Sequence, residues 1–381
     1  MIANKVEQIK FSTPYYGEEE AIAAANVIRS QWVVGGPNLV ELERRFAELS
    51  GAQYGIGVSS WTTGAFLALK ALGIGPGDEV ILPSLTFIAS VNVVVHAGAV
   101  PVFADIDAET WNIDPSDVAR KITSKTKLLL PVDQIGIPCD MDAINEIAKS
   151  NNLMVLEDAA CAFASANQGR PIGSLCDTTI FSLHARKIIT TGEGGMIVTN
   201  DKSFAERLKR LRHQGMSLSD FDRHHASPTV FETYPEVGYN FRMTDIQAAI
   251  GLKQLDRLQT ILTRRRHLAN RYQHYFKDYP WVMTPHIKRG LEPNWQSYQI
   301  KLRESAPFSR NELMETLYQH GIPTRRGVMA SHLEAPYLSF NAKLPNTESL
   351  AASSLQLPIH PALTDEQQDY IFQVFENLVN E

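Results

Sequence analysis

The chain contains little cysteine and no long apolar run. Its three cysteines, Cys139, Cys161 and Cys176, show neither the spacing of a disulfide framework nor that of a metal site, which is typical of proteins in a reducing compartment. Apolar runs such as Leu128–Val132 are far shorter than the roughly 20 residues that cross a membrane. The opening residues MIANKVEQIK lack the apolar core of a secretory signal. We therefore expect a cytoplasmic protein without a membrane-embedded part.

The chain also lacks an excess of positive charge and the common nucleotide-binding motifs. Its 381 residues include 36 Lys and Arg against 42 Asp and Glu, a formal net charge of −6, which argues against nucleic acid as a partner. Neither a Walker A motif, a GxGxxG motif nor the nucleophile elbow of a serine hydrolase occurs. The segment DFDRHHAS at 220–227 is rich in Asp and His but lacks HExxH-type spacing, so we expect a solvated loop and no metal site.

Short apolar strands alternate with amphipathic helices through most of the chain. We expect helices at 18–29, 39–49, 63–72, 89–97, 115–122 and 141–150, and strands at 80–83, 100–104, 126–131, 153–157 and on both sides of the segment 183–194. Such alternation is typical of an α/β domain with a largely parallel sheet.

The last third of the sequence follows a different pattern. One long helical stretch is expected from Asp245 to about Phe276, followed by a strand at SYQIKL and helices at 310–320 and 365–380. We place a domain boundary at the long helix, which gives a large domain of residues 1–255 and a smaller α+β domain of residues 256–381.

Polar side chains follow several of the predicted strands. Because ligands of open α/β sheets bind outside the carboxyl ends of the strands, these positions are candidates for a site. They are Glu157 and Asp158 in LMVLEDAACA, Ser182, His184 and Lys187 in TIFSLHARK, and Ser84, Thr86 and Phe87 in ILPSLTF. In VSSWTTGAF, Ser60, Trp61 and Thr62 begin a helix, and free amides and the helix dipole at such a terminus favour a phosphate.

A phosphate cup, an aromatic ring, a carboxylate and a lysine are the groups that bind pyridoxal phosphate. The lysine forms a Schiff base with the cofactor, and an aspartate keeps the pyridine nitrogen protonated. Asp158 suits the second role, and Phe87 suits stacking on the ring. Each residue alone has a commoner explanation: a helix cap, a turn, a core phenylalanine or a surface lysine. Their coincidence at strand ends favours the cofactor.

The segment FSLHARKIITTGEGGMIVTND resembles the cofactor-lysine segment of the nucleotide-sugar aminotransferases, the DegT/StrS group of fold type I pyridoxal-phosphate enzymes. The resemblance continues in GPGDEVILPSLTFIASVNVV, LEDAACA and GYNFRMTDIQAAIGLKQL and covers nearly the whole chain in the expected order. It implies a fold type I transferase, whose large domain has a mostly parallel seven-stranded sheet flanked by helices.

The resemblance also implies roles for individual residues. Lys187 and Asp158 would be catalytic, as the Schiff-base lysine and the partner of the pyridine nitrogen. The cofactor would also be held by Ser60, Trp61, Thr62, Phe87, Cys161, Ser182 and Asn240. Asn240 would reach the phosphate in the neighbouring subunit, which implies a homodimer with shared active sites.

The chain departs from the family pattern at three places. Many members have a small residue in place of Trp61, whose indole is expected to narrow the phosphate cup. Asp133-Gln134 replaces a histidine, and Cys161 replaces a glutamine that often contacts the ring hydroxyl. Candidate substrate contacts are Gln134, His184, Arg325 and His332; ordinary surface charge in the small domain is the alternative for Arg325 and His332.

The implied reaction moves an amino group, with L-glutamate as the expected donor, to a keto sugar carried by a nucleotide diphosphate, in amino-sugar or polysaccharide biosynthesis. Three alternatives remain open from the sequence. A dehydratase branch of the family replaces the lysine by histidine, and the presence of Lys187 argues against it. A cyclitol aminotransferase and a non-catalytic regulator that binds pyridoxal phosphate are the other two.

Overall fold

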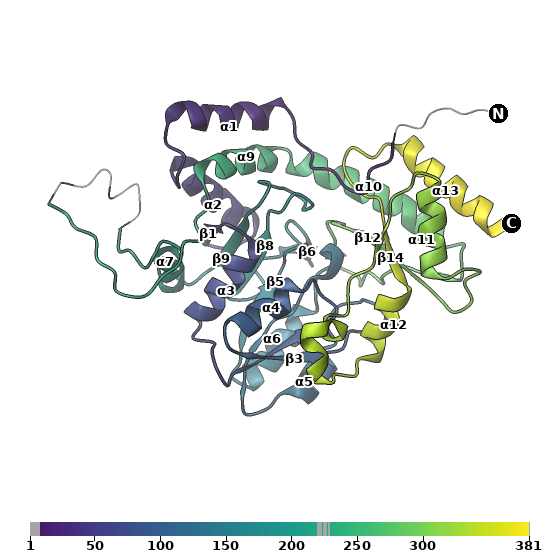
Figure 1. The fold of residues 1–381 in the computed structure, drawn as a ribbon, viewed down its shortest axis with the longest axis horizontal. Coiled ribbons are helices and arrows are strands. Elements are labelled where there is room, and N and C mark those ends of the chain that lie inside the picture. The colour runs from purple at the N-terminus through teal and green to yellow at the C-terminus, as the bar shows by residue number, and fades with distance from the viewer. Residues whose placement is uncertain (1–7, 219–222, 224–226, 228, 381) are drawn as a thin grey trace.

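The computed structural model describes residues 8–218, 223, 227 and 229–380 (Figure 1). Most of the segment 220–227, for which a solvated loop is expected, lies outside these residues. Among the described residues, no helix combines the length and apolar character that crossing a membrane requires.

A seven-stranded sheet forms the centre of the molecule. Its strands are β1 (Tyr54–Val58), β2 (Glu79–Pro83), β3 (Val100–Ala104), β4 (Thr126–Leu129), β5 (Met154–Asp158), β8 (Thr178–Ser182) and β9 (Gly195–Thr199). Their order is β1-β9-β8-β5-β4-β2-β3. The five strands from β8 to β3 are parallel, whereas β9 runs antiparallel to both of its neighbours. The predicted mostly parallel seven-stranded sheet is therefore confirmed.

Helices cover both faces of this sheet (Figure 1). One face packs against α3 (Trp61–Ala71), α4 (Ala89–His96) and α7 (Lys202–Leu211), and the other against α2 (Pro37–Leu49), α5 (Pro115–Lys121), α6 (Met141–Ser150) and α9 (Asp245–Asp256). Neighbouring strand residues divide between the two cores: Ile81 lies in one, Val80 and Leu82 in the other. This alternation, with apolar side chains on both faces, is what a sheet buried on both sides requires. Helix α1 (Glu18–Ser30) lies along α9.

The C-terminal part builds a second, smaller sheet. It contains β10 (Val282–Met283), β12 (Tyr298–Leu302), β13 (Arg325–Arg326) and β14 (Ser354–Leu357), in the antiparallel order β10-β12-β14-β13. A hydrophobic cluster joins it to α10 (Leu258–Phe276), α11 (Arg310–Gln319) and α13 (Asp365–Asn380). Three short strands, β6 (Ala166–Asn167), β7 (Arg170–Pro171) and β11 (Leu291–Glu292), form a third sheet.

The expected single helix from Asp245 to Phe276 is two helices. Between α9 and α10, Arg257 has φ −93° and ψ −3°, and its amide bonds to the carbonyls of Gln254 and Leu255 rather than to a carbonyl four residues back. The apolar pattern continues through this tightened turn, so the break is not visible in the sequence. The predicted domain boundary after residue 255 falls at this break and stays a prediction.

The C-terminal segment also contacts the large sheet. Helix α12 (Pro345–Ser353) begins beside the end of β3, where Asp105 Oδ1 accepts hydrogen bonds from the amide and the hydroxyl of Thr347, at 2.8 and 2.7 Å. Leu350 of α12 packs in a cluster with Leu85 and Trp111. The described residues also include three short 3₁₀ helices: η1 (Gln134–Gly136), η2 (Ser331–Leu333) and η3 (Ala335–Phe340).

The glycines of TTGEGG serve two geometric purposes. Gly192 has φ +84°, in the left-handed region that glycine adopts without steric cost. Gly195 starts β9 directly against the start of α3: a Cβ at this position would lie 2.6 Å from the carbonyl oxygen of Ser60 and 2.8 Å from the amide of Trp61. The absence of a side chain at Gly195 therefore allows β9 and the N-terminus of α3 to meet.

Gly195→Ala should destabilise the protein by about 1–3 kcal/mol, the usual cost of forcing a methyl group into a packed interior. The matched control is Gly75→Ala, because Gly75 has open space around its Cβ position and no positive φ. Urea denaturation of both variants measures the difference. Equal stability of the two variants would contradict the close packing of β9 on α3.

Candidate active site

Lys187 lies in the loop after β8, close to the carboxyl end of that strand. Its amide donates to the carbonyl of His184 at 2.9 Å. Its half-buried side chain places Nζ 3.1 Å from Cys161 Sγ. The loop therefore directs the lysine toward the segment that follows β5, in which Cys161 lies.

Asp158 ends β5, the parallel neighbour of β8, and is only 3% exposed. Its carboxylate accepts a hydrogen bond from Ser90 Oγ at 2.7 Å and one from the amide of Ala160 at 3.1 Å. Burial raises the pKa of Asp158 to about 6, although the Ser90 hydrogen bond and the charge of Lys187 oppose the shift. The carboxyl group is thus fixed in place, but the nearby donors and Lys187 only partly offset the cost of burying its negative charge.

Ser90, which sequence reasoning missed, positions this carboxylate. It is the second residue of α4, it is buried, and its hydroxyl also hydrogen-bonds to that of Thr86 at 2.9 Å. The signal in the sequence is weak: a serine in an otherwise apolar helix that follows a strand end.

The N-terminus of α3 lies beside β9. Ser60 caps the helix, since its hydroxyl accepts from the amide of Thr63 at 3.1 Å. Trp61 and Thr62 follow as the first helical residues, whose amides have no partner within a helix. The Trp61 side chain is 6% exposed and belongs to the core cluster that contains Val58 and Ile180; its expected effect on the width of the phosphate cup stays a prediction.

The other predicted cofactor residues occupy different environments. Ser182 is buried at the end of β8, and its hydroxyl accepts from the amide of His184 at 3.3 Å. Phe87, in the loop between β2 and α4, is 72% exposed. Asn240 is exposed and forms an isolated bridge with His213. The roles of these residues remain predictions.

Two of the four predicted substrate residues are engaged inside the protein. The Gln134 side-chain amide is buried and donates to the carbonyl of Leu85. His332 is 2% exposed, and its ring nitrogens lie 2.6 Å from Ser84 Oγ and 3.3 Å from Glu348 Oε1. The contacts of His332 join η2 to the segment after β2 and to α12.

The other two predicted substrate residues are accessible. His184 is half-buried, with Nε2 3.8 Å from a carboxylate oxygen of Glu193. Arg325 is exposed, and its guanidinium carbon lies 5.3 Å from the centre of the Phe11 ring.

Two further carboxyl groups, those of Glu157 and Asp133, are buried near Asp158. Glu157 and Asp133 are close enough for each to affect the pKa of the other. Glu157 Oε2 accepts from Thr179 at 2.7 Å and Asp133 Oδ1 accepts from the amide of Cys139 at 2.8 Å, whereas Glu157 Oε1 and Asp133 Oδ2 are buried without a donor. Burial raises the pKa of Glu157 to about 7, and burial together with the charge of Glu157 raises that of Asp133. A proton bound by the pair would give these oxygens a hydrogen bond.

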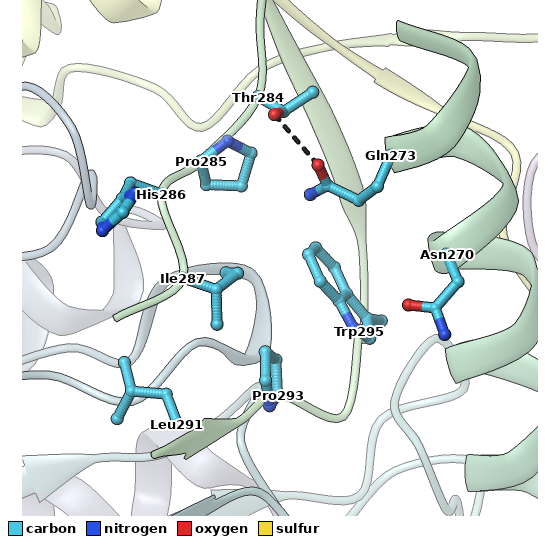
Figure 2. A pocket seen from close by; sticks show the side chains of 9 residues that line it. All are labelled: Asn270, Gln273, Thr284, Pro285, His286, Ile287, Leu291, Pro293 and Trp295. Carbon is cyan, nitrogen blue, oxygen red and sulfur yellow. Dashed lines mark hydrogen bonds between the residues drawn. The ribbon is translucent and has the colours of Figure 1, made fainter. Parts of the chain in front are cut away.

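A separate hollow of about 550 Å³ lies beside the C-terminal sheet. Figure 2 shows Asn270 and Gln273 of α10 facing Trp295 and the segment at Thr284, whose hydroxyl donates to Gln273 Oε1 at 3.1 Å. None of the predicted site residues lines this hollow. The candidate active site is therefore defined by the chemistry at the strand ends, and this hollow is distinct from it.

The residues at the strand ends fit pyridoxal phosphate. A protonated pyridine nitrogen would supply positive charge beside the buried Asp158 carboxylate, and the amides at the start of α3 would be available to a phosphate. Lys187 lies within electrostatic reach of the same carboxylate. Fold and site together define the class of fold type I pyridoxal-phosphate enzymes.

The chain belongs to the DegT/DnrJ/EryC1/StrS aminotransferase family, whose model matches residues 14–376. It is 37% identical to the spore coat polysaccharide biosynthesis protein SpsC of Bacillus subtilis over 100% of this chain and 99% of SpsC. Spr1654 of Streptococcus pneumoniae, solved in a PMP-form, superimposes with a TM-score of 0.90 at 30% identity, over 97% of this chain and 98% of that one.

A third relative is PseC of Helicobacter pylori, an aminotransferase involved in the biosynthesis of pseudoaminic acid. It has a TM-score of 0.91 and 27% identity, over 98% of this chain and 100% of PseC. The predicted family and fold type are confirmed. The chain is a pyridoxal-phosphate-dependent sugar aminotransferase.

The raised pKa of Glu157 makes stability depend on pH. Because the pKa of Glu157 is about 7 in the folded protein and about 4.3 in an unfolded chain, the folded state binds more protons between these values. The free energy of unfolding should therefore fall as pH rises from about 4.5 to about 7, by up to roughly 3 kcal/mol from this group.

Asp133→Asn should flatten this decline, because the amide donates to an ionised Glu157 without needing the proton. Urea denaturation of the cofactor-free protein at several pH values from 5 to 8 measures both slopes, and the contribution of Asp158 is common to both proteins. Parallel pH profiles for wild type and Asp133→Asn would show that no proton is shared.

Proposed function

We propose that this aminotransferase moves an amino group from L-glutamate to a keto sugar carried by a nucleoside diphosphate, acting as a cytoplasmic homodimer. The observation that supports a transferase best is the meeting of Lys187 and Asp158 at the carboxyl ends of the neighbouring parallel strands β8 and β5. The setting is supported by SpsC, whose name places it in spore coat polysaccharide biosynthesis.

Pyridoxal phosphate, when bound, accepts the electron pair left behind when a proton leaves the carbon atom that carries the amino group. The protein holds the charge that makes this possible. Asp158 would pair with the protonated pyridine nitrogen, and Ser90 fixes the carboxylate by its 2.7 Å hydrogen bond. Since this group is buried, water does not screen the pairing.

Lys187 carries the proton. In the first half-reaction its Nζ removes the proton from the donor's α-carbon, and in the second it delivers a proton to the acceptor's carbon. Removing a proton requires the amine to be neutral. Cys161 Sγ, 3.1 Å away, holds the side chain beside the site. Donor and acceptor react in turn, so one lysine serves both half-reactions. A dehydratase of this family needs a histidine in place of Lys187, and the chain lacks this replacement.

Exposed apolar side chains support the proposed homodimer. In the segment between α7 and α9, Phe231 is 79% and Val237 88% exposed, and Tyr234 lies between them on the surface. Neighbouring exposed apolar side chains of this kind mark interaction surfaces. Asn240 follows directly, so the same contact would carry it to the partner's site.

Two substitutions test the proposed roles of Lys187 and Asp158. Lys187→Ala should lower amino transfer by about 10²–10⁴-fold, since general acid–base catalysis contributes that much. Asp158→Asn should lower it by about 10²–10³-fold, the usual loss when one charge-stabilising group is removed. Exposed Lys202→Ala is the control.

The change in cofactor absorbance on adding L-glutamate measures the donor half-reaction. Product analysis with nucleotide-linked keto sugars measures the acceptor half-reaction. Near wild-type rates for Asp158→Asn would refute its role. A wild-type protein that binds pyridoxal phosphate but transfers no amino group from any donor would favour the regulator.

A further inference from the structure

Two arginines share one aromatic ring at the edge of the active site. The guanidinium carbons of Arg186 and Arg325 lie 4.9 and 5.3 Å from the centre of the Phe11 ring. Arg186 directly precedes Lys187 in the sequence, and Arg325 begins β13 of the C-terminal sheet. Two segments that are far apart in the chain thus bring like charges together next to the catalytic lysine.

The ring between them is held in place. Phe11 follows Ile9, which is buried in the C-terminal core, and Lys10, whose carbonyl lies 2.9 Å from His360 Nε2. Downstream, the carbonyl of Tyr15 accepts from Gln254 Nε2 of α9 at 2.9 Å. The N-terminal segment therefore fixes Phe11 between two parts of the protein, and the ring keeps both guanidinium groups close by cation–π attraction.

Neither guanidinium group has a carboxylate within 4.0 Å among the residues that the structure describes. Arg325 donates to the carbonyl of Thr324 at 2.9 Å. Although Arg186 is exposed as a residue, partial desolvation of its guanidinium and the charge of Arg325 hold its pKa below the usual value, against an opposing effect of Cys161. The next residue of β13 differs: the guanidinium of Arg326 lies 3.5 Å from a carboxylate oxygen of Glu334. Two neighbouring cations without an anion form a site that an anion stabilises.

We propose that Arg186 and Arg325 together bind the anionic oxygens of a substrate of the aminotransferase, presented as a carboxylate or a diphosphate. Planar guanidinium groups bind both anions through paired hydrogen bonds. The amino donor carries the first anion and the nucleotide-linked sugar the second, so the inference rests on the proposed function for its substrates. Phe11 is the positioning residue that keeps the two arginines together.

The test measures binding rather than turnover. Calorimetry with the pyridoxal-phosphate-loaded protein uses two probes, UDP for the diphosphate and 2-oxoglutarate for the carboxylates, neither of which brings an amino group to the cofactor. The variants are Arg186→Gln and Arg325→Gln, with Phe11→Leu to keep an apolar side chain without the aromatic ring. Arg326→Gln is the matched control on the same strand.

We expect each arginine variant to weaken one probe at least tenfold, Phe11→Leu to weaken the same probe less, and Arg326→Gln to change it less than twofold. Weaker UDP binding assigns the pair to the sugar nucleotide, and weaker 2-oxoglutarate binding to the donor. Arginine variants that match Arg326→Gln for both probes would overturn the inference, and so would a wild-type protein that binds neither.

The amino-transfer assay keeps this inference separate from the proposed function. Binding that depends on Arg186 and Arg325 in a protein that transfers no amino group would leave the anion site standing and remove the proposed function. Amino transfer by the wild type, together with probe binding that neither arginine variant weakens, would support the proposed function and remove the anion site.

Discussion

The buried carboxylate of Asp158 is the constraint on which the site depends. It sits at the end of a central parallel strand, with Ser90 and the amide of Ala160 as donors and Lys187 as the nearby opposite charge. A carboxylate in such surroundings is costly unless a cation meets it. A protonated pyridine ring is such a cation, so the same burial that raises the pKa of Asp158 favours the cofactor in its electron-accepting form. Next to it, burial raises the pKa values of Glu157 and Asp133, which disfavours two further full charges at this point.

The fold brings the other groups to this carboxylate by close backbone packing. Parallel pairing of β5 with β8 sets Asp158 beside the strand that leads to Lys187. Antiparallel β9 returns along β8, and Gly195 lets it touch the start of α3, where the phosphate-binding amides are expected. The C-terminal sheet adds Arg325, and the N-terminal segment adds Phe11. Short contacts among segments that are distant in the sequence therefore join the catalytic residues, the expected phosphate-binding amides and the proposed anion site.

Much of this arrangement could be predicted because strong local signals agreed with one another. Apolar strands followed by polar residues predicted the parallel sheet and the positions of Lys187 and Asp158. Other elements gave weaker signals: β1 contains two glycines in five residues, and α7 is highly charged. Contacts between distant segments carry no local pattern, which is why Ser90, Arg186 and Phe11 were missed. The contacts that hold the side chains of Gln134 and His332 in the interior are likewise invisible in the sequence, and the substrate roles of both residues stay predictions.

The central claim is that Asp158 keeps the pyridine nitrogen of bound pyridoxal phosphate protonated. The most direct test is the nitrogen NMR chemical shift of cofactor labelled with ¹⁵N in its ring, measured in wild type and in Asp158→Asn at neutral pH. The account predicts a protonated nitrogen in the wild type and an unprotonated one in the variant. An unprotonated nitrogen in the wild type, or a protonated one in both proteins, would contradict it.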